Sequence, residues 1–213
     1  MKTDELIAML ASGAEAAESH ALQRRYITTL GWGAFGATLM MALLLGVRAD
    51  LLDATRLPMF WVKLAFPAAL FAGALLAALR LSRPGAELGA IPAAIAAPVL
   101  AMWLLAAVVL FGATSGDRDE LIFGHSAASC PFVIALLSVP LFVAALWAMK
   151  DLAPTRLVLA GAASGLLAGA GGALVYALYC PEMAAPFIGI WYLLGMSIPA
   201  AVGAAIGPSV LRW

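Results

Sequence analysis

Six long apolar runs dominate the pattern of hydrophobic and polar positions along this chain. A helix needs roughly 20 apolar residues, at about 1.5 Å each, to cross a hydrocarbon core of about 30 Å. None of the runs alternates strictly between apolar and polar residues, so the pattern predicts helices rather than barrel strands. The expected spans are Tyr26–Val47, Met59–Leu79, Ile91–Phe111, Pro131–Met149, Leu157–Tyr179 and Phe187–Gly207.

The composition supports a membrane protein. Of the 213 residues, 64% are hydrophobic and only 11% are charged, whereas a soluble domain carries roughly 25% charged residues. The net charge is zero, which gives no electrostatic basis for direct binding to nucleic acid. The start of the chain lacks the basic stretch and short apolar core of a cleaved signal peptide. The sequence therefore predicts an all-α, polytopic protein that keeps its first span.

The distribution of lysine and arginine predicts the orientation. Short loops on the cytoplasmic side collect these residues. One side of the six spans collects eight of the twelve, which are Lys2, Arg24, Arg25, Arg80, Arg83, Lys150, Arg156 and Arg212. We therefore expect both termini in the cytoplasm, a cytoplasmic N-terminal segment at 1–25 and a six-helix transmembrane domain at 26–213.

The N-terminal segment 1–25 is the largest polar stretch on the predicted cytoplasmic side. Its acidic residues suit the positive end of a helix, and its apolar residues begin a narrow stripe with a helical period. Such a short helix is marginal alone and would gain stability by docking into a groove on a partner. The alternative is a solvated tail. The residues expected to make the contact are Asp4, Glu5, Leu6, Ile7 and Leu10.

Lys63 is the ionisable residue that lies inside an apolar run. It lies about one turn from the predicted outer boundary, so we expect its stem to extend toward water, where its ammonium could pair with Asp50 or Asp53. A buried lysine in a conduction path is the alternative.

The fifth run carries small residues at every fourth position, at Gly161, Gly165 and Gly169. This spacing permits close approach of two helices in lipid. It predicts an internal seam between helices, with a homodimer face as the alternative.

The chain has two cysteines, Cys130 and Cys180, and a proline follows each. Both lie at predicted helix ends on the outer side. A permanent disulfide, a reversible thiol switch and two unrelated packing residues all remain open, because an oxidising compartment permits a disulfide but does not require one. The dipole of the helix that Cys130 begins favours a thiolate, so we expect Cys130 to be the more reactive thiol.

A soft metal ion is a further use of these thiols, because thiolates prefer such ions. His125 precedes Cys130 by five residues, and Glu182 and Met183 closely follow Cys180. These five residues could together hold a metal, although no cofactor is expected to be obligatory. A solvated loop histidine is the alternative for His125.

Several short motifs in their span context resemble the NrsF family of six-span membrane anti-sigma factors, and the resemblance covers essentially the whole chain. The motifs are Met1-Lys2-Thr3-Asp4-Glu5-Leu6-Ile7, Trp61-Val62-Lys63-Leu64, Cys130-Pro131, Tyr176-Ala177-Leu178-Tyr179-Cys180-Pro181-Glu182, Trp191-Tyr192-Leu193-Leu194-Gly195 and Leu211-Arg212-Trp213.

The resemblance implies a regulator of transcription in the bacterial inner membrane. Such proteins hold an extracytoplasmic-function (ECF) sigma factor and release it under metal or oxidative stress. The resemblance implies that Cys130 and Cys180 are the sensor thiols. From the topology we add that residues 1–25 would contact the sigma factor.

Two other classes of protein fit the sequence less well. A small transporter or channel would carry ionisable residues at mid-membrane depth, and the predicted spans contain almost none. A membrane thiol oxidoreductase usually carries a Cys-x-x-Cys pair, whereas here the two cysteines are fifty residues apart. We therefore expect that the chain is not an enzyme.

Overall fold

The computed structural model describes residues 15–48, 50–83, 85–152 and 154–212. These residues form helices and connections without a β-strand, which confirms the predicted all-α fold. Within these described ranges, six helices are long and apolar enough to cross a membrane. The chain therefore has the expected polytopic architecture.

The six spans follow the predicted order. Helix α2 begins eleven residues before the predicted first span, and the other ends differ by a few residues. The helices are α2 (Glu15–Leu44), α4 (Pro58–Leu81), α5 (Ile91–Gly112), α7 (Cys130–Lys150), α8 (Leu157–Ala177) and α10 (Leu193–Val210). The last span also includes α9 (Ala185–Phe187) and a π-helical turn, η1 (Ile188–Tyr192). Two short helices lie in the loops, α3 (Leu51–Ala54) and α6 (Arg118–Phe123).

Proline and glycine set several helix boundaries. Pro58 and Pro131 lie in the first turn of α4 and α7, where proline costs no hydrogen bond. Gly46 adopts a φ of 76°, and its N–H donates to the carbonyl of Met41 at 3.1 Å. This is the left-handed cap that glycine favours, and it lies two residues after the end of α2 and two residues before Arg48.

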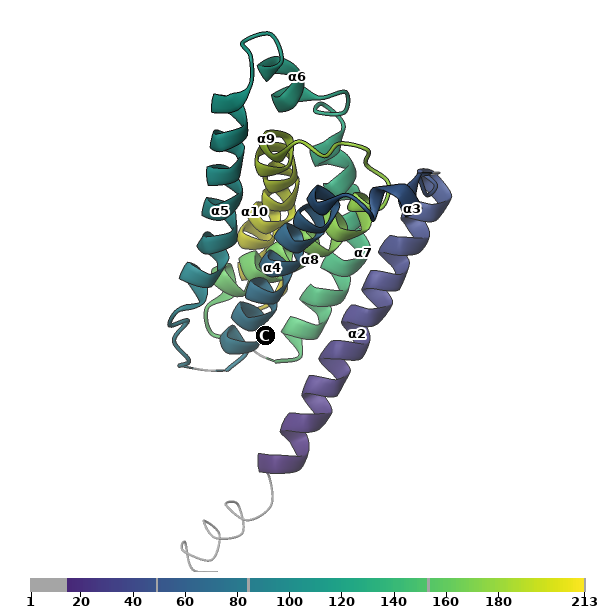
Figure 1. The fold of residues 1–213 in the computed structure, drawn as a ribbon. Helices are drawn as coiled ribbons and strands as arrows, with labels where there is room; N and C mark the ends of the chain where they lie inside the picture. Colours follow the sequence, from purple (N-terminus) through teal and green to yellow (C-terminus); the bar gives the residue numbers. More distant parts are fainter. Residues whose placement is uncertain (1–14, 49, 84, 153, 213) are drawn as a thin grey trace, which may run out of the picture.

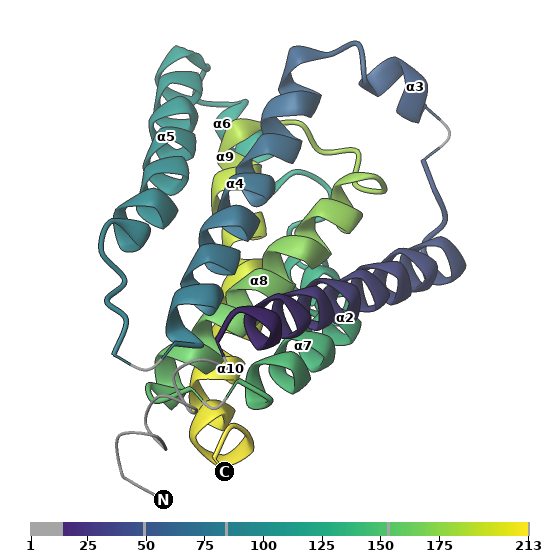
Figure 2. The same cartoon turned by 90° about the horizontal axis from the view of Figure 1, so that it is seen from below.

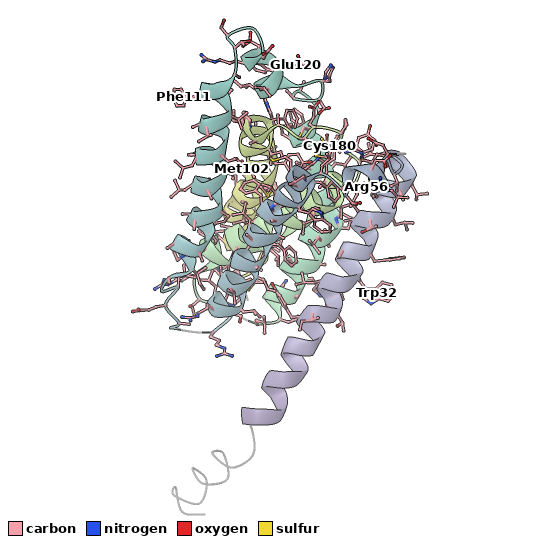
Figure 3. The ribbon with its side chains drawn as sticks, viewed as in Figure 1. Trp32, Arg56, Met102, Phe111, Glu120 and Cys180 are labelled. Carbon is pink, nitrogen blue, oxygen red and sulfur yellow. The ribbon has the colours of Figure 1, made fainter. Side chains whose placement is uncertain are left out.

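The central helix of the bundle is α8. It packs against α10, α7 and α4, and the largest share of its residues is buried among the six spans that the described residues form. Helix α2 lies along α7 on one side, while α5 lies at the periphery against α4 and α9 (Figures 1 and 2). On the outer surface of α2, Trp32 points away from the bundle and is 75% exposed, as expected for a lipid-facing residue (Figure 3).

The small residues of α8 form the predicted internal seam. A Cβ atom added to Gly161 would collide with the carbonyl of Gly203, and one added to Gly165 would collide with the carbonyl of Pro199. A Cβ on Gly169 would lie 2.7 Å from the carbonyl oxygen of Met196. The backbones of α8 and α10 therefore touch directly, and the stripe is used inside the chain.

The bundle has two distinct ends. The start of α2, the α4–α5 connection and the C-terminal end of α10 lie at one end, which we call the terminal end (Figure 1). Helices α3 and α6 and Cys180 lie at the opposite end, the cysteine end (Figures 1 and 3). The structure thus places the two cysteine-bearing segments away from the termini, as the span count predicts.

The seam predicts a specific loss of stability. Gly165→Ala should destabilise the solubilised protein by about 1–3 kcal/mol, because the added methyl group meets backbone that cannot move aside. Gly31→Ala on α2 is the matched control, since nothing lies within 4 Å of its added Cβ. Thermal unfolding followed by size-exclusion chromatography measures both variants, and equal stability of the two would contradict the seam.

Candidate functional site

Both cysteines lie in the interior of the cysteine end. Cys130 is the first residue of α7, and Cys180 lies three residues beyond the end of α8. Both are free thiols with an exposed fraction of 0%. They belong to one buried cluster with Tyr176 and Tyr192, and the two thiols lie within electrostatic range of each other.

The local sequence explains where these residues lie. The N–H of Cys130 donates to the carbonyl of Ser126 at 2.9 Å, which starts the helical hydrogen bonding of α7. The N–H of Cys180 donates to the carbonyl of Tyr176 at 2.9 Å, and Pro181 then prevents α8 from continuing. Because both thiols are buried, access rather than the helix dipole limits the reaction that we expected of Cys130.

Lys63 lies differently from the prediction. Its side chain is completely buried, with an exposed fraction of 0%. The ammonium donates to the carbonyl oxygen of Cys180 at 2.6 Å and to that of Glu182 at 2.9 Å. It also lies 5.6 Å from the centre of the Tyr192 ring. The expected extension toward water is therefore wrong, because carbonyls just beyond the C-terminal end of α8 offer the ammonium closer acceptors.

The pairing of Lys63 with Asp50 that the sequence allows does not form, because Arg48 binds that carboxylate. The guanidinium of Arg48 donates to the two carboxylate oxygens of Asp50 at 2.7 and 2.6 Å. This hydrogen bond lowers the pKa of Asp50, so the pair is ionised at neutral pH. A third nitrogen of Arg48 donates to the carbonyl of Cys180 at 3.3 Å. Asp53 instead lies 3.9 Å from Arg56.

Two tyrosines complete the buried cluster. The rings of Tyr176 and Tyr192 have centroids 5.7 Å apart. The hydroxyl of Tyr192 is buried and has no hydrogen-bond partner among the described residues. Tyr192 ends the π-helical turn η1, a geometry that is common at functional sites. The sequence placed Tyr192 only within a family motif and gave it no role, because a tyrosine in an apolar run carries no sign of the contacts it will make.

The predicted metal ligands do not form one set. The backbone N–H of His125 donates to the Glu182 carboxylate at 2.8 Å, while the His125 side chain is 86% exposed. Met183 is half-buried, and both thiols are fully buried. In the described part of the chain, no three His, Cys, Asp or Glu side chains are placed to hold a metal ion. The structure pairs His125 with Glu182 and places the two cysteines in one buried cluster.

The predicted contact residues of the N-terminal segment lie outside the described residues. These are Asp4, Glu5, Leu6, Ile7 and Leu10. The described chain begins at Glu15, and from there one continuous helix, α2, enters the first span. Any partner bound at the N-terminus would therefore connect directly to α2.

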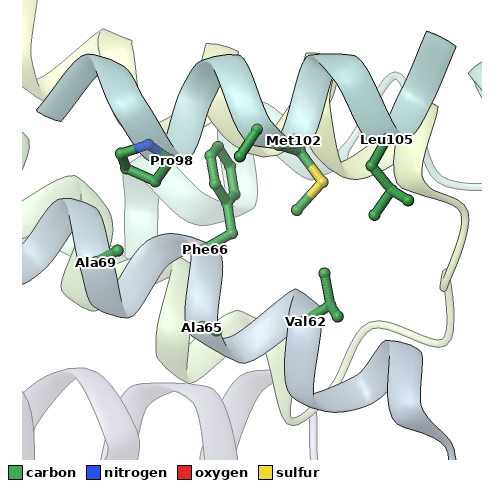
Figure 4. A pocket seen from close by; sticks show the side chains of 8 residues that line it. Val62, Ala65, Phe66, Ala69, Pro98, Met102 and Leu105 are labelled. Carbon is green, nitrogen blue, oxygen red and sulfur yellow. The ribbon is translucent and has the colours of Figure 1, made fainter. Parts of the chain in front are cut away.

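A groove between α4 and α5 is a separate feature. It has a volume of about 300 Å³ and is lined by apolar side chains, including Phe66 and Met102 (Figure 4). Its lining contains no ionisable residue. It therefore offers no chemistry comparable to that of the buried cluster.

The burial of the thiols predicts slow labelling. In membranes, Cys130 and Cys180 should react with a small maleimide at least about tenfold more slowly than a cysteine introduced at exposed Ser129, because a buried thiol reacts only after local opening. Ser129→Cys in a chain lacking the native thiols provides the comparison, read by mass spectrometry. Similar rates for all three would contradict the burial.

Comparisons with known proteins agree with this architecture. Residues 10–213 match the family model for NrsF, described as a negative regulator of sigma F. The chain is 59% identical to the "Probable anti-sigma-F factor NrsF" of Azospira oryzae and 38% identical to the "Anti-sigma-F factor NrsF" of Caulobacter vibrioides, each over the full length of both proteins. No solved structure matches the chain. The protein belongs to the NrsF family of negative regulators of sigma F.

Proposed function

We propose that this chain is an anti-sigma factor that holds an ECF sigma factor at the bacterial inner membrane and releases it when Cys130 and Cys180 are oxidised. Family membership supports the regulatory role, and six span-capable helices support the membrane location. The observation that carries the sensing role is the burial of both thiols in one cluster at the end opposite the termini.

The arrangement divides sensing from binding. Lysine and arginine collect in the loops of the terminal end, so this end faces the cytoplasm under the positive-inside rule. The N-terminal segment then lies where a sigma factor is found. The cysteine end faces the outer compartment, where oxidants first arrive. This topology requires that a change at the thiols be passed through the helices of the bundle.

The chemistry at the thiols is a two-electron oxidation. A hydroperoxide serves as the oxidant: attack by one thiolate on a peroxide oxygen breaks the O–O bond and leaves a sulfenic acid. The second thiol attacks that sulfur and displaces water, so two thiols and one hydrogen peroxide give a disulfide and two waters. The Cα atoms of the two cysteines must come within about 7 Å for this bond to form.

A soft metal ion is the second stimulus that the sequence suggests. The five predicted ligands do not meet in the described arrangement, because His125 is exposed and paired with Glu182 while the thiols are enclosed. A metal site would require the segment after α6 to move inward. The proposed function therefore depends on thiol oxidation and includes no step through a metal.

Neither a transporter nor a homodimer is needed. Among the described spans, Lys63 is the charged residue that is buried. Its ammonium donates to two backbone carbonyls and does not line a pathway for ions. The small-residue stripe of α8, which could have formed a dimer face, packs on α10 instead. The relatives are named as regulators, which supports a protein that is not an enzyme.

Removing the thiols tests the sensing role. Cys130→Ser and Cys180→Ser should each leave the sigma factor bound after oxidant treatment, because a single thiol cannot form the disulfide. Pull-down from solubilised membranes, with and without hydrogen peroxide, measures bound sigma factor, and a reporter gene measures release in cells. Ser138→Ala is the control, since it alters another buried polar residue of α7. Normal release from both cysteine variants would disprove the sensing role.

The N-terminal contact has its own test. Replacing Leu6 and Leu10 together with aspartate should lower the amount of retained sigma factor at least about tenfold, because two apolar anchors of a docked helix are lost. Ser12→Asp adds a charge away from this stripe and should have little effect. Equal retention by all three chains would place the contact elsewhere.

A further inference from the structure

The carbonyl of Cys180 is the point where three parts of the chain meet. Lys63 on α4 and Arg48 after α2 both donate to this one oxygen, at 2.6 and 3.3 Å. We propose that Lys63 and Arg48 form a clamp on Cys180 that keeps α2 and α4 in the arrangement that binds the sigma factor. This proposal rests on the proposed function and supplies its route from the thiols to the terminal end.

Lys63 is suited to this role because its position is fixed. The side chain is fully buried, and its ammonium also donates to the carbonyl of Glu182 at 2.9 Å. Among the described residues, no carboxylate forms an ion pair with it. A buried ammonium that loses its acceptors is costly. Any displacement of residues 180–182 must therefore either move α4 or leave this charge unsatisfied.

Arg48 links the same carbonyl to α2. The left-handed cap at Gly46 ends α2, so Arg48 follows the helix after a short, defined connection. Asp50 orients the guanidinium through two hydrogen bonds. Helix α2 begins at Glu15 and leads from the N-terminal segment. A shift of the Cys180 carbonyl is thus transmitted to the helix that follows the predicted sigma contact in the chain.

Cys130 acts on α2 from its other side. It begins α7, and α2 packs closely on α7. A Cβ added to Gly33 of α2 would lie 2.9 Å from the Cα of Leu141, and one added to Gly36 would lie 3.2 Å from the Cβ of Pro140. Both thiols are therefore connected to one helix, Cys130 through direct packing of α7 and Cys180 through the clamp.

Disulfide formation would pull on this clamp. The Cys180 carbonyl carbon is bonded to the Cα that carries the reacting thiol, and a hydrogen bond of 2.6 Å is lost once its atoms separate beyond about 3.5 Å. Cutting the clamp by mutation should then imitate oxidation. Lys63 and Arg48 are positioning residues in this scheme, since neither reacts with the oxidant.

The test uses the full chain in membranes, with diamide as the thiol oxidant. Diamide takes two electrons and two protons from the thiols, becomes a hydrazine and leaves the disulfide. Lys63→Met and Arg48→Gln are each placed in the wild-type chain and in the chain with both cysteines replaced by serine. Arg56→Gln is the control for Arg48→Gln, because Arg56 belongs to the same end but is exposed. Ser138→Ala is the control for removing a buried polar contact.

We expect both clamp variants to retain at least about tenfold less sigma factor than wild type before diamide is added, the shift expected from losing a hydrogen bond to a charged group. The loss should appear in both backgrounds, because the clamp acts after the thiols. Diamide should still convert the wild-type thiols of each variant to the disulfide, which shows that the fold persists. Both controls should retain sigma factor as wild type does.

If the clamp variants retain as much sigma factor as wild type in untreated membranes, the clamp is wrong, regardless of the result after diamide is added. Loss that disappears in the background without cysteines also overturns it. If Lys63→Met fails to reach the membrane, Arg48→Gln decides by the same criteria. Failure of the proposed function looks different: the chain without cysteines would then itself release sigma factor on addition of diamide.

Discussion

The buried ammonium of Lys63 constrains the arrangement of the cysteine end. A charge without access to water must be surrounded by acceptors, and here the acceptors are the carbonyls of Cys180 and Glu182. These carbonyls are available because Pro181 ends the helical path of α8 and leaves backbone groups without intrahelical partners. The Cys-Pro pair therefore does two things: it places a thiol in the interior, and it presents the carbonyl that α4 requires.

The glycine seam supports this arrangement from the other side of α8. Direct backbone contact between α8 and α10 leaves little freedom for α8 to rotate or slide, because there is no room even for a Cβ atom at Gly161, Gly165 or Gly169. Helix α8 is thus a fixed central element. Strain created at the thiols would be relieved in residues 180–184 and in the helices attached to them, rather than in the centre of the bundle.

The sequence predicted the fold well because the signals are local. A run of about 20 apolar residues specifies a spanning helix regardless of its neighbours, and proline or glycine marks several of the ends. The candidate site was predicted only in part. Cys130 and Cys180 are conspicuous as residue types, whereas the positions of Lys63 and Arg48 depend on contacts more than one hundred residues away. A lysine near a span boundary has two outcomes, extension toward water or burial on a carbonyl, and tertiary packing decides between them.

The energies involved suit a switch rather than a permanent brace. Moving a population from 1:99 to 99:1 requires about 5.5 kcal/mol of differential free energy. A hydrogen bond to a charged group contributes about 1.5–3 kcal/mol, so the two bonds of Lys63 together supply about 3–6 kcal/mol. Breaking them is therefore of the right size to move the bundle between two states. The free energy needed to break these bonds is also comparable to that of disulfide formation. A disulfide typically changes stability by about 2–4 kcal/mol, and the reduction potential of the oxidant adds to the driving force. A looser contact, such as an exposed ion pair of about 0–1 kcal/mol, would be too weak to separate a holding state from a releasing one.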